Sequence, residues 1–238
     1  MVFGLDKRQQ AEYAERIFNR FKRTICMSAK TDKLLSILKL QPVVPVLVID
    51  DVATAVPLAR ALVAGGLKAI EITLRTPAAL EAIRAVANEV EGAVAGAGTI
   101  LNAAQFEAAI EAGSQFIVSP GTTQELIDVA NDHDAPLLPG AATASEVMGL
   151  REEGYDVMKF FPAEQAGGAA YLKSLSSPLA GTFFCPTGGI SLSNARDYLS
   201  LPNVICVGGS WVAPKDLVTK GDWAGITKLA AEAFALKG

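Results

Sequence analysis

Histidine is almost absent from this chain of 238 residues, since His133 is the only one. This excludes a metal site built from several histidines. Asp132 and Asp134 flank His133, so we expect it in an exposed turn rather than in a serine-histidine-aspartate triad. Any catalysis must therefore use lysine, carboxylate, hydroxyl or backbone groups.

Cysteine and long apolar runs are also scarce. Cys26, Cys185 and Cys206 lack CxxC spacing, and thiols of this kind fit a reducing compartment, so a cytoplasmic location is expected. No segment offers the roughly 20 consecutive apolar residues that would span a bilayer. The net charge of -4 argues against a nucleic-acid-binding protein.

Apolar runs punctuated by glycine are abundant and recur about every 20 to 26 residues, as expected for strand-helix units. The expected strands cover residues 43–49, 69–74, 93–99, 116–121, 136–142, 157–163, 183–189 and 204–210. Eight such units in about 200 residues predict an α/β fold, a single (β/α)8 TIM barrel. The alternative is an open, doubly wound sheet.

The expected helices between these strands have recognisable ends. Threonines predict three helix starts: Thr76 before Pro77, and the capping boxes Thr122 with Glu125 and Thr143 with Glu146. Glycines at 65–66, 113 and 154 are expected to end helices.

The second expected strand has one polar face, which carries Glu71, Thr73 and Arg75. Its other face is apolar, with Ile70, Ile72 and Leu74. A parallel strand covered by helices is normally apolar on both faces. The polar face therefore indicates a chemically active barrel interior. The alternative is a buried ion pair between Glu71 and Arg75, which would add little net stability.

Lys159 lies in an otherwise apolar run, residues 157–162. Burial disfavours the charged form of a lysine and thereby favours a nucleophilic amine. Alternation along the strand puts Lys159 on the same face as Val157 and Phe161, so it can project into the interior beside Glu71 and Arg75. The alternative is a lysine at a strand edge that prevents aggregation or reaches solvent.

Two glycine-rich turns follow the last two expected strands. Barrels often bind phosphate at these positions, where bare backbone N–H groups can approach the anion. A single Gly-Gly pair would indicate only a tight turn. Two pairs at the expected places predict a phosphate site formed by Thr187, Gly188, Gly189, Gly208, Gly209 and Ser210.

Six motifs, taken in order, closely resemble one family. They are Glu71-Ile72-Thr73-Leu74-Arg75-Thr76, Gly96-Ala97-Gly98-Thr99, Ser119-Pro120-Gly121, Lys159-Phe160-Phe161-Pro162-Ala163-Glu164, Cys185-Pro186-Thr187-Gly188-Gly189-Ile190-Ser191 and Gly208-Gly209-Ser210-Trp211. The chain resembles, from about Leu34 to its C-terminus, the bacterial 2-keto-3-deoxy-6-phosphogluconate (KDPG) aldolases, which also cleave 4-hydroxy-2-oxoglutarate (KHG).

The resemblance implies a class I aldolase of the Entner-Doudoroff pathway, a lyase that needs neither metal nor another cofactor. KDPG would yield pyruvate and glyceraldehyde 3-phosphate, and KHG would yield pyruvate and glyoxylate. A homotrimer is also implied. The rival readings are another phosphate-binding barrel enzyme, or a trimeric scaffold in a larger assembly.

The resemblance also implies roles for individual residues. Lys159 would form the Schiff base, and Glu71 would be the general acid and base. Arg75 with Thr99 would hold the substrate carboxylate. The substrate pocket would include Phe161 and Pro120.

Residues 1–26 have no counterpart in the family pattern, whereas residues 27–238 form the expected aldolase domain. Tyr13, Ile17, Phe21 and Ile25 recur at every fourth position, which predicts an extra amphipathic helix at the N-terminus. Three interpretations are open: an upstream start or vector-derived segment without function, a helix that docks on the barrel or on a neighbouring subunit, or a membrane-surface helix.

Overall fold

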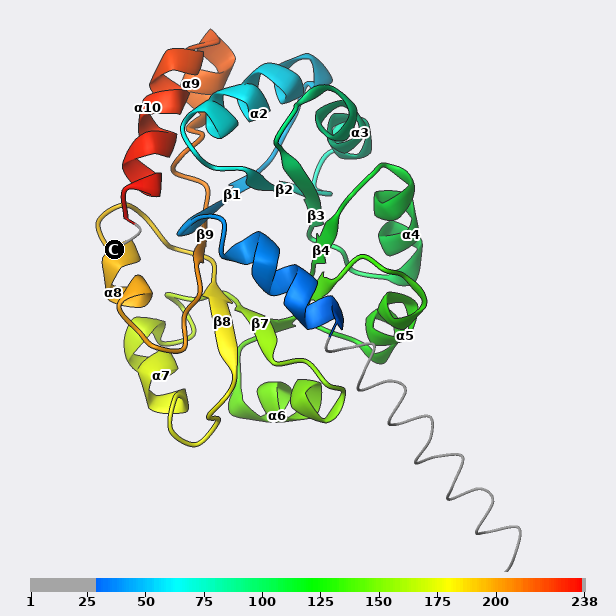
Figure 1. Ribbon diagram of the computed structural model, residues 1–238, viewed down its shortest axis with the longest axis vertical. Coiled ribbons are helices and arrows are strands. Elements are labelled where there is room, and N and C mark those ends of the chain that lie inside the picture. Colours follow the sequence, from blue (N-terminus) through cyan, green and yellow to red (C-terminus); the bar gives the residue numbers. More distant parts are fainter. Residues whose placement is uncertain (1–28, 237–238) are drawn as a thin grey trace, which may run out of the picture.

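The computed structural model describes residues 29–236, which form an α/β fold with parallel strands inside and helices outside (Figure 1). The helix predicted within residues 1–26 lies outside the described residues. Within the described part of the chain, no helix is both long and apolar enough to cross a membrane.

A strand is found in each region where one was predicted, although most strands are shorter than expected. The strands are β1 (Val43–Leu47), β2 (Ala69–Thr73), β3 (Val94–Gly98), β4 (Phe116–Val118), β5 (Leu137–Leu138), β6 (Gly140–Ala141), β7 (Val157–Phe160), β8 (Phe183–Pro186) and β9 (Val207–Gly209). The fifth expected strand forms the two short pieces β5 and β6, separated only by Pro139. Proline has no N–H to donate to a ladder, which accounts for a break at this residue.

All strand pairs are parallel, and they form a curled arrangement (Figure 1). One sheet has the order β5-β4-β3-β2-β1-β9, and the other has the order β6-β7-β8. The first strand therefore pairs with the last strand, β9. Two isolated bridges, Phe184 to Val204 and Thr187 to Gly208, link the chain at β8 to the chain at β9.

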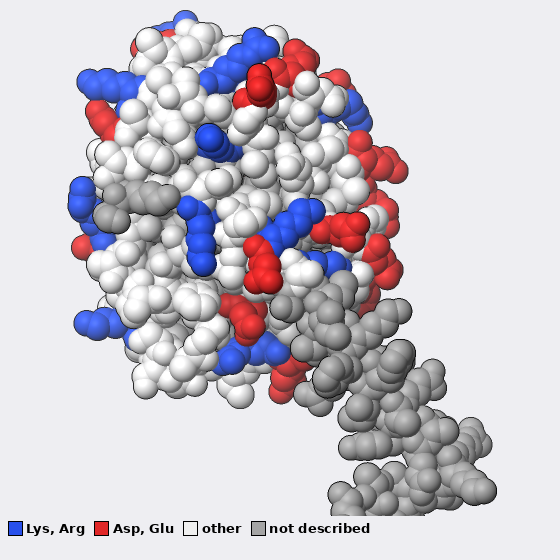
Figure 2. All heavy atoms as spheres, in the orientation of Figure 1, with Lys and Arg blue, Asp and Glu red and all other residues white. Residues whose placement is uncertain are grey.

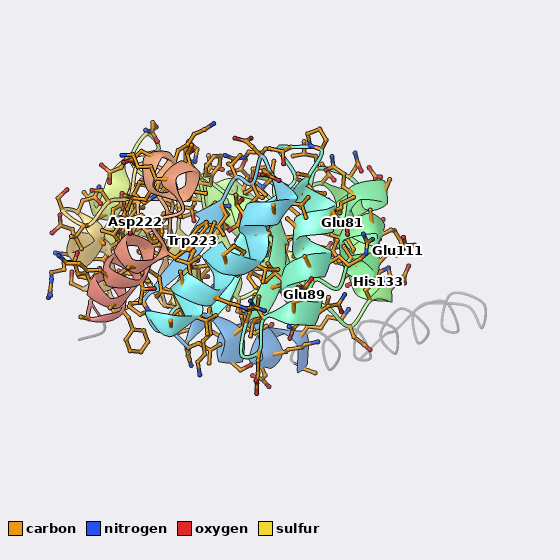
Figure 3. All side chains as sticks on the ribbon, turned by 90° about the horizontal axis from the view of Figure 1, so that it is seen from above. Glu81, Glu89, Glu111, His133, Asp222 and Trp223 are labelled. Carbon is orange, nitrogen blue, oxygen red and sulfur yellow. The ribbon has the colours of Figure 1, made fainter. Side chains whose placement is uncertain are left out.

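The helices surround the strands on the outside (Figures 1 and 3). They include η1 (Val52–Thr54), α2 (Ala55–Ala64), α3 (Ala79–Glu89), α4 (Ala103–Glu111), α5 (Gln124–Asp132), α6 (Ala144–Glu152), α7 (Gly168–Leu175), α8 (Ala195–Leu199), α9 (Lys215–Lys220) and α10 (Trp223–Phe234). Residues 29–38 are also helical.

One of the three predicted helix starts is confirmed, and two are wrong. The capping box of Thr143 with Glu146 is confirmed at the start of α6. The prediction for Thr122 was wrong by one residue, because Thr123 caps α5 and accepts a hydrogen bond from Leu126 N. The prediction for Thr76 was also wrong, since α3 begins at Ala79 and the Thr76 hydroxyl donates instead to Ile49 O.

The predicted helix ends are confirmed. Gly65 is the C-cap of α2, and Gly66 follows with a φ of 97°. Gly113 and Gly154 have φ values of 96° and 93° directly after the caps of α4 and α6. These left-handed conformations are open to glycine at little steric cost.

The alternation predicted along the strands is confirmed by two separate apolar cores. Ile72 of β2 and Phe160 of β7 belong to the large core that packs against the outer helices. Ala69 and Val157, on the opposite faces of the same strands, belong to a smaller interior core. The polar residues Glu71 and Lys159 therefore share the interior face of their strands.

The helix of residues 29–38 closes the interior at the N-terminal ends of the strands, and no prediction anticipated it. Leu34, Ile37 and Leu38 contribute its buried face to the smaller core. Lys30 anchors the helix by donating to Ala130 O at 2.7 Å. Figure 2 shows this end of the molecule, with acidic side chains gathered along the edge that α3, α4 and α5 form.

Candidate active site

Lys159 and Glu71 meet inside the curled sheet. Lys159 Nζ lies 3.2 Å from Glu71 Oε1, and each residue is only 3% exposed. β2 and β7 are not neighbouring strands, so the contact crosses the interior. Burying an ammonium or a carboxylate costs free energy unless the group has a partner of opposite charge. Here Lys159 and Glu71 are each other's partners. The predicted proximity of the two residues is confirmed.

Apolar and small residues surround the pair of Lys159 and Glu71. The ring centroid of Phe161 lies 5.4 Å from Lys159 Nζ, close enough for a cation-π contact. On β3, the strand next to β2, Gly98 lies against the Glu71 carboxylate. On the neighbouring strand, Cys185 is the register partner of Lys159. Lys159 is thus a buried amine with one carboxylate in reach and apolar groups around it, which suits a nucleophile.

Arg75 and Thr99 are also brought together, as predicted. Arg75 Nε donates to Thr99 Oγ1 at 3.0 Å, and Arg75 is exposed, so its remaining guanidinium N–H groups can bind an anion. The alternative ion pair of Arg75 with Glu71 is not found among the described residues, where Glu71 is paired with Lys159.

Thr99 has an unusual backbone conformation. Its φ is 59°, the one positive value at a non-glycine residue in the described part of the chain. This left-handed region is strained for a β-branched residue, and such strain is common at functional sites. The strained position directs the Thr99 hydroxyl to Arg75.

The two glycine-rich turns lie side by side. Thr187 and Gly208 form an isolated bridge between the turns, and a Cβ at Gly208 would lie 2.2 Å from Thr187 Oγ1. The Thr187 hydroxyl is buried and has no hydrogen-bond partner among the described residues. Gly188 and Gly189 have φ values of 103° and 75°. The predicted phosphate-binding segments therefore form one cluster.

Ser210 lies at the edge of that cluster and lines a cavity of about 620 Å³. The cavity lies between the end of β1 and helix α9, with Leu47 and Trp211 among its apolar lining residues. Ser210 is the one predicted site residue in its lining. The cavity thus borders the second glycine turn at Ser210, and Lys159 does not line it.

Pro120 lies next to β6, which pairs with the strand of Lys159, whereas His133 lies outside the strands. The backbone of Pro120 packs against Gly140, where a Cβ would lie 2.3 Å from Pro120 C, so Pro120 is placed at the start of β6. His133 is the C-cap of α5 in the outer helix layer (Figure 3), with its ring against Phe106 and Nε2 3.4 Å from Glu107 Oε1. A bend at residues 133–135 fits the expected turn, but the expected exposure was wrong, because these contacts partly bury His133.

One contact beside the glycine turns was missed. Tyr198 donates a hydrogen bond to Glu164 Oε1. Glu164 ends the Lys159-Phe160-Phe161-Pro162-Ala163-Glu164 motif, but no role was assigned to it. The sequence separation of 34 residues left no local signal for this pair.

The chain matches the family model of KDPG and KHG aldolases over residues 34–229. It belongs to this family. The KHG/KDPG aldolase of Escherichia coli K12 is 51% identical over 198 residues, which cover 83% of this chain and 93% of that protein. As a member of a family of carbon-carbon lyases, the chain is an enzyme.

Two crystal structures of family members resemble this fold. The 2-keto-3-deoxy-6-phosphogluconate aldolase of Zymomonas mobilis ZM4 with 3-phosphoglycerate is 54% identical, with a TM-score of 0.81 and coverage of 85% of this chain and 95% of that one. The Legionella pneumophila KDPG aldolase, with pyruvate captured at low pH as a covalent carbinolamine intermediate, is 42% identical, with a TM-score of 0.82 and coverage of 84% and 97%.

Proposed function

We propose that this protein is a class I aldolase that cleaves KDPG to pyruvate and glyceraldehyde 3-phosphate, and KHG to pyruvate and glyoxylate. The observation that carries the proposal is the buried contact of Lys159 Nζ with Glu71 Oε1. It supplies a nucleophile and a proton carrier at one place. The covalent carbinolamine in the Legionella pneumophila relative supports chemistry of this kind.

In the proposed reaction, the neutral amine of Lys159 attacks the keto carbon of the substrate to form a carbinolamine. Glu71, which has first taken one proton from the Lys159 ammonium, delivers it to the keto oxygen as the amine attacks. Glu71 then takes the second proton that the nitrogen loses and donates it to the resulting hydroxyl, so water departs and a protonated imine remains. Glu71, directly or through water, then removes the proton of the C4 hydroxyl. The C3–C4 bond breaks, its electron pair moves into the imine, and the aldehyde leaves. Protonation of the resulting enamine at C3 and hydrolysis of the imine release pyruvate and regenerate Lys159.

The remaining site residues bind the substrate. Arg75, fixed by its hydrogen bond to Thr99, holds the carboxylate next to the keto carbon. Phe161, which lies over the Lys159 amine, and Pro120 line the pocket. The phosphate binds at the glycine turns, to the backbone N–H groups and hydroxyls of Thr187, Gly188, Gly189, Gly208, Gly209 and Ser210.

The proposal includes a closed (β/α)8 barrel. The pairing of β1 with β9 and the bridge of Thr187 to Gly208 support closure on one side, and the single-residue break at Pro139 supports it on the other. A homotrimer follows from the family resemblance, and sedimentation of the full chain tests it. A cytoplasmic location fits Cys185 and Cys206, both free thiols.

Reduction with sodium borohydride in the presence of pyruvate tests the chemistry, followed by peptide mass mapping. We expect a pyruvate-sized adduct on the peptide that carries Lys159. A folded sample without any adduct would overturn the imine mechanism. It would favour a phosphate-binding barrel enzyme of another class, which needs no interior lysine.

A further inference from the structure

A buried tyrosine is tied to the turn that follows the catalytic lysine. Tyr198 belongs to α8 and is 1% exposed, and its hydroxyl donates to Glu164 Oε1. Glu164 lies between β7, which carries Lys159, and helix α7. Burial of the ring, and then the hydrogen bond to Glu164, raise the pKa of Tyr198, so its hydroxyl keeps its proton and remains a donor.

The neighbouring Gly188-Gly189 turn needs external restraint. Both glycines have positive φ values, and glycine loses more conformational freedom on ordering than any other residue. Contacts from the turn after β7 supply part of the restraint, since Ala163 N donates to Thr187 O at 2.8 Å and Glu164 N donates to Gly188 O at 3.1 Å.

The side chain of Glu164 supplies a further contact. A Cβ at Gly189 would lie 2.7 Å from Glu164 Cβ and 2.6 Å from its Cγ, so the stem of Glu164 covers Gly189. Glu164 is exposed, and without a fixed end its side chain would sample several rotamers. Tyr198 fixes that end, and both Tyr198 OH and Glu164 Oε1 lie near Gly168 at the start of α7.

This arrangement also controls a charge. A carboxylate that moved toward the glycine turns would repel a bound phosphate. The hydrogen bond from Tyr198 keeps one carboxylate oxygen at the start of α7. The opposite end of the turn is held from the same helix region, because Asn194 Nδ2 donates to Gly189 O at 3.0 Å just before α8.

We propose that Tyr198 and Glu164 are positioning residues that hold the Gly188-Gly189 turn in its phosphate-binding form. Neither is a catalytic residue. The hydrogen bond makes the enzyme selective for the phosphorylated substrate over the shorter, unphosphorylated one. This inference rests on the proposed function, since it assigns the phosphate to these turns.

The test compares Tyr198→Phe with Tyr171→Phe. Tyr171 is a matched control, because its ring stacks on Phe160 while its hydroxyl has no hydrogen bond to any described residue. We expect Tyr198→Phe to lower kcat/KM for KDPG about tenfold relative to kcat/KM for KHG, through KM, as loss of a hydrogen bond to a charged group predicts. Tyr171→Phe should leave the ratio of the two substrates within about twofold of the wild-type ratio.

Variants of Glu164 distinguish a role in positioning the glycine turn from a general effect on stability. Glu164→Gln keeps the stem and an acceptor oxygen for Tyr198 and should retain the substrate ratio, whereas Glu164→Ala should lose it as Tyr198→Phe does. An equal loss for both substrates in Tyr198→Phe, or no change in their ratio, overturns the inference.

A binding measurement separates this inference from the proposed function. Inorganic phosphate should bind Tyr198→Phe about tenfold more weakly than wild type by calorimetry, whether or not the enzyme forms an imine. If Tyr198→Phe binds phosphate more weakly but wild type forms no borohydride adduct, only the aldolase chemistry is rejected. An unchanged phosphate affinity would reject the positioning role alone.

Discussion

Gly98 leaves the space that the Glu71 carboxylate occupies. A Cβ at Gly98 would lie 2.0 Å from Glu71 Oε1 and 2.6 Å from its Cδ. β3 is paired with β2 along this stretch, so backbone movement cannot relieve the overlap without breaking the ladder. The position of the proposed proton carrier therefore depends on a residue that carries no functional group.

Gly98→Ala should displace Glu71 from Lys159 and lower kcat for KDPG cleavage about 100-fold, because a misplaced acid-base group loses most of its contribution. Steady-state kinetics measures the loss. Gly149→Ala is the control, since Gly149 lies in α6 and a Cβ there meets nothing within 4 Å. Wild-type turnover by Gly98→Ala would show that Glu71 is not required at this place.

Lys159→Ala should abolish cleavage of both substrates and the borohydride adduct, because it removes the nucleophile. Glu71→Gln should lower kcat by about 100- to 10,000-fold but still form the adduct slowly, because the amine is retained. Turnover assays and adduct mass spectrometry distinguish the two variants. Wild-type cleavage by Lys159→Ala would refute the mechanism.

The same pair predicts a stability effect. Lys159→Met should lower the free energy of unfolding by about 3–5 kcal/mol, because it leaves the Glu71 carboxylate buried without its partner. The double variant Lys159→Met with Glu71→Gln should recover much of the loss. Urea unfolding monitored by circular dichroism measures both. Additive losses in the double variant would mean that the two side chains are energetically independent.

Alternation along strands was sufficient to predict the centre of the site. The spacing between Glu71 and Arg75, and between Val157, Lys159 and Phe161, fixes which side chains face inward once a parallel strand is assumed. The structure confirms inward positions for Glu71, Val157 and Lys159, whereas Arg75 lies beyond the end of β2 and is exposed. Alternation does not predict which inward-facing side chains contact each other. The alternative ion pair of Glu71 with Arg75 was therefore wrong, because Glu71 is paired with Lys159.

Contacts between distant segments account for the missed features. Thr122 and Thr123 both fit a cap of α5. Because Thr123 is the cap, the box position falls on Leu126, and the Glu125 carboxylate accepts instead from Ala103 N of α4. The helix of residues 29–38 has its apolar side chains at i, i+3 and i+4, at Leu34, Ile37 and Leu38, which is a helical pattern.

Arg75→Lys should reduce kcat/KM for KDPG by about 10- to 100-fold, mainly through KM. Lysine keeps the charge but loses the planar set of N–H donors that can bind Thr99 and a carboxylate together. Arg84→Lys is the matched control, since Arg84 lies on α3 and pairs only with Glu81 among the described residues. Equal effects of the two substitutions would argue against a carboxylate contact at Arg75.

Glu146, at the start of α6, should make the free energy of unfolding depend on pH in the acid range. Glu146 Oε2 accepts from Ala142 N at 2.8 Å and from Thr143 N at 2.9 Å. These bonds, that from Ala142 first, lower the pKa of Glu146 from its usual 4.5. A lowered pKa in the folded state means that the carboxylate stabilises the fold above pH 4.5 and that this contribution disappears as the pH falls below it.

Glu146→Gln should therefore cost about 0.5–1 kcal/mol of unfolding free energy at pH 7, the range for an exposed cap, and less at acid pH. Urea unfolding at pH 7, 5 and 3.5 measures the difference between wild type and variant, which should shrink at the lowest pH. Glu152→Gln, at the other end of α6, controls for the loss of one negative charge from the same helix. A difference that stays constant across this range would mean that the charge of Glu146 does not contribute, and that only its shape matters for the start of α6.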